Sequence, residues 1–171
     1  MVESGKLNWK WWLLVSVVVL FLDQATKQWV LSNMPLYDSI EVLPFFNLTH
    51  VHNYGAAFSI LSDQPGWQRW FLSIVTMVIS VVLLVWLTRL RSHQYLLAAA
   101  LVFILGGALG NLYDRVAYGY VVDFIDWYYG DYHWPAFNLA DAAIFLGAVL
   151  LIIDTLVNSE DNSKSADEVA G

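Results

Sequence analysis

A chain of 171 residues that is 58% hydrophobic and only 13% charged is too apolar for an ordinary water-soluble domain, in which about a quarter of the residues are charged. Its net charge of −7, with eight basic residues in all, excludes the basic surface that nucleic-acid binding needs. The absence of cysteine excludes disulfides, thiol catalysis and cysteine-ligated metal. The composition therefore predicts an integral membrane protein.

Four segments are predicted to cross the bilayer, because each supplies about 20 mostly apolar residues. They lie at about 11–31, 70–88, 95–113 and 136–157. Lysines before the first segment, and arginines between the second and the third, indicate that these parts of the chain are cytoplasmic. Both chain ends are then expected to be cytoplasmic, and the segments 32–69 and 114–135 to be extracytoplasmic.

The first predicted span contains an acid and a base. Asp23 and Lys27 are four residues apart and therefore share one face of the helix. One interpretation is a mutually neutralising pair that fixes the end of the helix, and the other is a pair that shapes the floor of a site. The spacing leaves both open.

The segment 32–69 is predicted to contain strands. Between residues 38 and 68 it is rich in β-branched and aromatic residues, followed by turn-forming residues. His50 and His52 would share one face of a strand, but two histidines without a nearby cluster of acids are a weak indication of metal binding. We therefore expect no metal site there.

The third predicted span has no charge and contains the run Gly-Gly-Ala-Leu-Gly, which lets helices approach closely. Asn111, Asp114 and Arg115 follow this run, and Asn111 and Arg115 share a helix face. One interpretation is a helix end whose arginine extends to the membrane surface. We favour the other, in which Arg115 anchors a carboxylate or a carbonyl group of a substrate.

Asp123 is a lone acid within the apolar sequence Tyr-Val-Val-Asp-Phe-Ile. The aromatic segment around it predicts a short strand followed by an amphipathic element at the membrane interface. Apolar surroundings raise the pKa of a carboxyl group by desolvation, which would mark Asp123 as functional. The alternative is an exposed acid on an edge strand, and this is how we interpret the neighbouring Asp126.

The fourth predicted span begins with Phe-Asn-Leu-Ala-Asp. Asn138 and Asp141 have the spacing of an N-cap residue and its N3 partner, so Asp141 could serve only to cap the helix and complement its dipole. Asn138 alone could cap, however, and an acid at this end of the bilayer indicates a further role. The polar tail 158–171 is predicted to be disordered.

Asp123 and Asp141 both fall near the outer face of the membrane in this topology. Two carboxyl groups that meet in a partly dry place share a proton. One can then act as a base towards water, while the other donates a proton to the carbonyl oxygen or leaving amine of a peptide bond. The sequence has neither His-Glu-x-x-His nor Gly-x-Ser-x-Gly, so the pattern favours peptide hydrolysis of the aspartic type.

Five short motifs stand in order along nearly the whole chain except the tail. They are DQATK at 23–27, NYGAAFS at 53–59, GGALGNLYDR at 106–115, VVDF at 121–124 and FNLAD at 137–141. Together they resemble the bacterial lipoprotein signal peptidases, also called signal peptidase II. The resemblance implies an all-α polytopic membrane protein with four transmembrane helices, a small extracytoplasmic β-sheet cradle and a short periplasmic helix, with residues 1–157 as one peptidase domain.

The resemblance also implies roles for individual residues. Asp123 and Asp141 would be the catalytic pair, without metal or cofactor. The substrate-binding or supporting residues would be Asn53, Gly55, Asn111, Arg115, Asn138, Asp23 and Lys27.

The implied substrate is a diacylglyceryl-modified prolipoprotein, cleaved just before its lipid-modified cysteine. The resemblance implies a monomer in the inner (cytoplasmic) membrane of a bacterium, in contact with membrane lipid, with its active site near the periplasmic face. Peptide antibiotics of the globomycin type would compete for that site.

Two other functions fit the same residues. A small proton-coupled carrier or assembly factor would use Asp23, Asp123 and Asp141 as a proton relay, although no inverted repeat is apparent. A helix-packing partner would use its acids only for pairing and capping.

Overall fold

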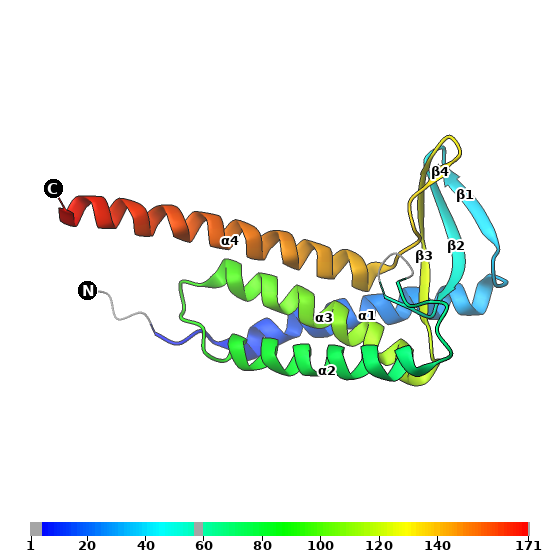
Figure 1. Cartoon of the computed structure of the whole chain (residues 1–171), viewed down its shortest axis with the longest axis horizontal. Coiled ribbons are helices and arrows are strands. Elements are labelled where there is room, and N and C mark those ends of the chain that lie inside the picture. Colours follow the sequence, from blue (N-terminus) through cyan, green and yellow to red (C-terminus); the bar gives the residue numbers. More distant parts are fainter. Residues whose placement is uncertain (1–4, 57–59, 171) are drawn as a thin grey trace.

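The computed structural model describes residues 5–56 and 60–170, and side chains up to residue 158. Four helices lie side by side, and a small sheet stands across one end of them (Figure 1). The elements in chain order are α1 (Trp9–Asn33), β1 (Ser39–Leu43), β2 (Phe46–Asn53), α2 (Trp67–Leu87), α3 (Tyr95–Ala117), β3 (Val121–Tyr129), β4 (Tyr132–His133) and α4 (Leu139–Ala170).

The prediction of four membrane-spanning helices is confirmed. The helices that are long and apolar enough to cross a bilayer are Trp9–Asn33, Trp67–Leu87, Tyr95–Ala117 and Leu139–Asn158. The backbone of α4 continues as a helix to Ala170, although its apolar part ends at Asn158. We retain as a prediction that the polar segment 158–171 is disordered in solution, because its composition offers no apolar face to bury.

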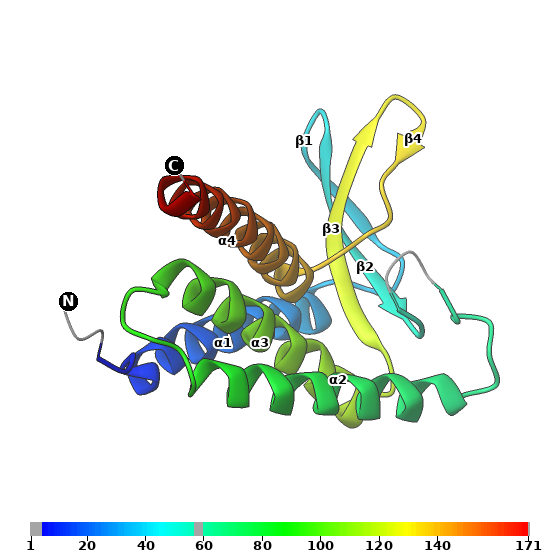
Figure 2. The same ribbon diagram turned by 60° about the vertical axis from the view of Figure 1, so that its left-hand side comes forward.

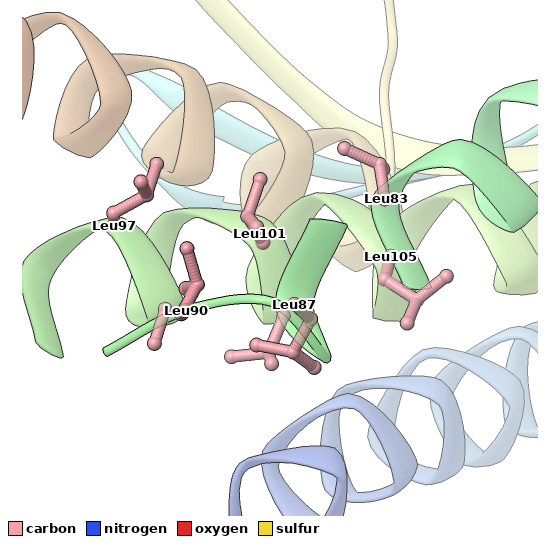
Figure 3. Packing of buried hydrophobic residues seen from close by; sticks show 8 residues of the cluster. Leu83, Leu87, Leu90, Leu97, Leu101 and Leu105 are labelled. Atoms are coloured by element: carbon pink, nitrogen blue, oxygen red, sulfur yellow. The ribbon is translucent and has the colours of Figure 1, made fainter. Parts of the chain in front are cut away.

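Helix α3 is the centre of the bundle. In its apolar window 67% of the residues are buried, against 22% in α1 and α2 and 11% in α4. Leucines of α3 interlock with those of α2 and of the turn that follows it (Figure 3). The labelled members of this cluster are Leu83, Leu87, Leu90, Leu97, Leu101 and Leu105.

The small-residue run of α3 brings neighbouring helices close, as predicted. A Cβ atom on Gly106 would meet the backbone of Ser16 in α1, and one on Gly107 would overlap the carbonyl oxygen of Ala140 in α4. These contacts hold the start of α4 against the middle of α3.

The sheet is antiparallel, with strand order β1-β2-β3-β4. The strands predicted within residues 38–68 are β1 and β2. The amphipathic element predicted after β3 is instead a hairpin, because the chain turns back at Gly130, whose φ of 58° suits glycine. The short helix expected over the site is not among the elements of the described residues.

A buried ammonium group joins three helices at the end that carries the sheet. The Nζ atom of Lys27, in α1, lies 2.9 Å from Asp23 Oδ2 and 2.9 Å from Asp114 Oδ2, and all three side chains are fully buried. Asp23 Oδ1 accepts from the backbone N–H of Ala140 at 2.9 Å, and Asp114 Oδ2 accepts from that of Val122 at 3.1 Å. The pair predicted from spacing is therefore part of a network that also fixes α4 and β3.

Replacing Gly107 with alanine should lower the free energy of unfolding by about 1–3 kcal/mol, because α4 must move away from α3. Thermal unfolding in detergent micelles measures the loss. Gly5→Ala is the control, since nothing lies within 4 Å of the added methyl group. Equal unfolding temperatures for the two variants would contradict this account of the close contact.

Replacing Lys27 with methionine should cost about 3–5 kcal/mol, because two buried carboxylates lose their counter-charge. Unfolding temperature and the yield of folded protein measure the loss. Lys10→Met removes an exposed ammonium from the same helix and should change little. A Lys27→Met protein as stable as Lys10→Met would show that the network does not hold the helices together.

Candidate active site

The carboxyl group of Asp123 lies in β3 and faces the start of α4. Its Oδ1 atom accepts from Asn138 Nδ2 at 2.7 Å, and its Oδ2 atom accepts from Asn53 Nδ2 at 3.0 Å. The side chain is buried, and this burial, with the nearby charge of Asp141, raises the pKa of Asp123 to about 7. The raised pKa expected from its apolar neighbours is confirmed.

Asp141 lies in the first turn of α4 and makes the capping contacts that its spacing predicts. Its backbone N–H donates to Asn138 Oδ1 at 2.9 Å, and its Oδ2 atom accepts from the backbone N–H of Asn138 at 3.3 Å. Its Oδ1 atom accepts from Asn111 Nδ2 at 2.8 Å. Capping does not exclude a further role, because the charge of Asp141 also acts on Asp123.

Two asparagine amides are oriented so that their NH₂ groups face the two acids. The Oδ1 atom of Asn138 is occupied by the N–H of Asp141, which directs Nδ2 towards Asp123. The Oδ1 atom of Asn111 accepts from Lys27 Nζ at 3.0 Å, which directs Nδ2 towards Asp141. Asn138 Nδ2 also lies 3.3 Å from Asn111 Oδ1. Lys27 thus orients one of the three asparagine amides that donate to the pair.

Arg115 holds the backbone that passes beside the pair. Its Nη2 atom donates to the carbonyl oxygen of Gly55 at 2.9 Å, and the N–H of Gly55 donates to Asn53 Oδ1 at 2.9 Å. A side chain at Gly55 would overlap the carbonyl oxygen of Ile60, so the turn needs glycine. The expected anchoring of a substrate by Arg115 stays a prediction, since the carbonyl group it binds here belongs to the protein.

A cleft of about 360 Å³ opens beside Asp123. Polar and apolar groups from β2, from β3, from the segment between β2 and α2 and from the loop before α4 line it. They are Val51, His52, Asn53, Tyr54, Ser62, Asp63, Asp123, Pro135 and Ala136. Asp123 therefore adjoins a space that an extended peptide segment could enter.

Asp126 is not the exposed acid that we predicted. Its side chain is buried, and it accepts from Asn47 Nδ2 at 2.9 Å and lies 2.9 Å from His133 Nδ1. The prediction was wrong because β3 is not an edge strand at this point. Asp126 pairs with Asn47 of β2 on one side, while on the other side β3 forms a bridge with Phe137 and pairs further along with β4.

The two histidines of β2 share one face, as their spacing predicts. Their Nε2 atoms are 3.1 Å apart, His50 Nδ1 lies 2.9 Å from the carbonyl oxygen of Met34, and His52 stacks on Tyr120. Burial and the charge of His50 lower the pKa of His52, which favours its neutral form. Among the described residues no group of three possible metal-ligating side chains comes together.

Two residues of the polar network received no role from the sequence. Asp114 was assigned only to a helix end, yet it binds Lys27 and the start of β3. Gln24 donates to Asp114 Oδ1 at 2.9 Å and to the carbonyl oxygen of Gly110 at 3.2 Å. Both residues lie within the motifs quoted above. The sequence feature that could have identified them is a polar side chain inside an apolar span.

The chain matches the family model described as Signal peptidase (SPase) II over residues 15–157. It is 54% identical to a lipoprotein signal peptidase of Alteromonas mediterranea, covering 99% of this chain and 92% of the relative. It is 52% identical to one of Shewanella amazonensis, covering 97% of this chain and 96% of the relative.

Two solved structures of bacterial membrane enzymes, obtained by the in meso method, share the fold. The one at 2.3 Å resolution has a TM-score of 0.83 and 35% identity, over 93% of this chain and 95% of its own. The one at 1.9 Å resolution has a TM-score of 0.78 and 36% identity, over 90% of this chain and 97% of its own.

The resemblance read from five motifs is thereby confirmed, and the carrier and helix-packing interpretations are set aside. Four membrane-spanning helices and peptidase relatives over nearly the full length identify a multi-pass bacterial membrane enzyme. The chain belongs to the signal peptidase II family, whose members remove signal peptides from prolipoproteins.

Proposed function

We propose that Asp123 and Asp141 are the catalytic pair of an aspartic endopeptidase. The observation that carries the proposal is the position of Asn138, whose side chain contacts both acids, one from β3 and one from α4. Asn138 binds the carboxyl group of Asp123 through its side chain and that of Asp141 through its backbone N–H, which supports a carboxyl pair that shares a proton at the end of a span.

The proposed reaction divides the two roles between the acids. Asp141 accepts a proton from the attacking water, whose oxygen forms a bond to the carbonyl carbon of the peptide. Asp123 begins protonated and donates its proton as the carbonyl oxygen gains charge. Collapse of the tetrahedral intermediate breaks the C–N bond as the proton held by Asp141 passes to the leaving amine and a hydroxyl group of the intermediate returns a proton to Asp123. The raised pKa of Asp123, about 7, supports its role as the acid.

We further propose that the substrate is a diacylglyceryl-modified prolipoprotein, cut just before its lipid-modified cysteine. A cysteine that carries two acyl chains stays at the membrane surface. Asp123 lies in the strand that follows α3, and Asp141 lies in the first turn of α4, so the pair lies at one end of the predicted spans. The sheet would then be the extracytoplasmic cradle of an inner-membrane enzyme. Both chain ends would lie in the cytoplasm. Arg115 would bind a carbonyl group of the substrate. Globomycin-type peptides would compete with the substrate for the site. The enzyme would act as a monomer.

Asp123→Asn and Asp141→Asn should each lower the rate of cleavage by at least about 10²–10⁴-fold, because each removes a proton acceptor or donor from the reaction. The assay is cleavage of a diacylglyceryl-modified prolipoprotein by the purified protein in detergent. A chelator should leave the wild-type rate unchanged.

Asp126→Asn is the matched control, from the same strand. An asparagine there can still accept from Asn47 and donate to a neutral His133, so the variant should fold and keep most of its activity. Retained cleavage by either Asp123→Asn or Asp141→Asn would refute the proposed pair, and a rate that depends on added metal would refute the metal-free mechanism.

The value of kcat/KM should fall as the pH rises through about 7, approaching about tenfold for each pH unit. The sign follows from the raised pKa of Asp123, since the carboxyl group holds its proton below about pH 7 and loses it above. Initial rates across this range test the prediction, with the unfolding temperature measured in the same buffers. A rate that rises through this range in a protein that stays folded would assign the acid to another group.

A further inference from the structure

In the outer part of the sheet, which lies beyond the catalytic pair, one face is apolar and the other is polar. Cross-strand neighbours point to the same side of a sheet, and successive residues of a strand point to opposite sides. Two cross-strand rows make up the apolar sheet face, namely Ile40, Leu48 and Ile125, and Leu43, Phe46 and Trp127. The row between them, on the other face, is Glu41, Asn47 and Asp126.

The apolar sheet face looks towards the start of α4. Asp123 precedes Ile125 by two residues and therefore lies on the same face, and it contacts Asn138 at the start of α4. On the opposite face Val122 packs with Val30 of α1. In both views the strands leave the bundle and project past the start of α4 (Figures 1 and 2). Their outer part therefore overhangs the membrane beside α4.

The sheet lies at the depth of the bilayer surface. Helix α1 advances 21 residues from Trp9 to Val30, or about 32 Å at 1.5 Å per residue. This is the thickness of the hydrocarbon core, about 30 Å. Since Val30 is where α1 meets the sheet, the sheet lies at the level of the lipid headgroups.

Apolar side chains of this face are left uncovered by the rest of the described protein. Trp127 is 57% exposed, Ile40 48% and Leu43 46%. Tyr129, the next residue of β3 on the same face, is 88% exposed. Tryptophan and tyrosine are enriched at the boundary between lipid and water, where their rings contact both.

We propose that the apolar sheet face rests on the headgroup layer of the bilayer beside α4, with Trp127 and Leu43 in the lipid interface. The contact holds the catalytic strand at a fixed height above the membrane. The polar face, with its hydrogen-bonded Asn47 and Asp126, points to water. The proposal concerns membrane contact alone and does not depend on the catalytic roles proposed above.

The absence of cysteine allows single labelling sites to be introduced. Ile40→Cys and Trp127→Cys place a small nitrobenzoxadiazole fluorophore on the apolar sheet face. Glu41→Cys, the exposed neighbour of Ile40 on the same strand, places it on the polar face and is the matched control. The proteins are placed in phosphatidylglycerol–phosphatidylethanolamine nanodiscs without substrate. Quenching is measured with lipids spin-labelled at the headgroup and, separately, with aqueous iodide.

Labels at 40 and 127 should be quenched several-fold more by the lipid-borne quencher than the label at 41, and iodide should show the reverse order. Equal quenching at 40, 41 and 127 would overturn the proposal, as would stronger iodide quenching at 40 and 127. Lipid quenching that appears only after a diacylglyceryl-modified substrate is added would assign the face to the substrate and would also overturn it. Unfolding temperatures verify that each labelled protein is folded.

Discussion

The buried ammonium group of Lys27 is the interaction on which the site depends. Its two carboxylate partners each bind one further backbone N–H, that of Ala140 through Asp23 and that of Val122 through Asp114. Ala140 and Val122 immediately precede the two acids of the pair. A single positive charge therefore ties together the backbone segments that carry Asp141 and Asp123, although these lie in different elements.

The membrane environment requires every polar group of this network to have a hydrogen-bond partner. Water is scarce at this depth, so a buried polar group without a partner costs several kcal/mol, of order 2–7 kcal/mol for an amide or a hydroxyl. Among the described residues every buried side-chain nitrogen and oxygen atom has a hydrogen-bond partner. Because Lys27 can only donate, the oxygen of Asn111 must face it, and the NH₂ group of Asn111 is left for Asp141. The charge that holds the fold thus also sets the direction of a hydrogen bond to the proposed catalytic pair.

Features governed by local spacing could be predicted from the sequence. The four apolar helices, the pairing of Asp23 with Lys27 and the capping contacts of Asn138 with Asp141 follow from residues a few positions apart. Contacts between distant segments could not be predicted. Asp114 meets Lys27 from another helix, Arg115 binds the carbonyl of Gly55, and the burial of Asp126 depends on a hairpin in a segment whose sequence predicted an amphipathic interfacial element. No periodicity within one element encodes such pairings.

The pair is thus subject to two separate constraints. The Lys27 network fixes the two acids relative to each other, and it does so from within the protein. It cannot set their height relative to the bilayer, because helices can tilt and shift in lipid at modest cost. The proposed contact of the apolar sheet face supplies that second constraint, since Trp127 lies on the same strand and the same face as Asp123, four residues away. A peptide bond next to a lipid-anchored residue also has a fixed height, so an enzyme that cuts it requires both.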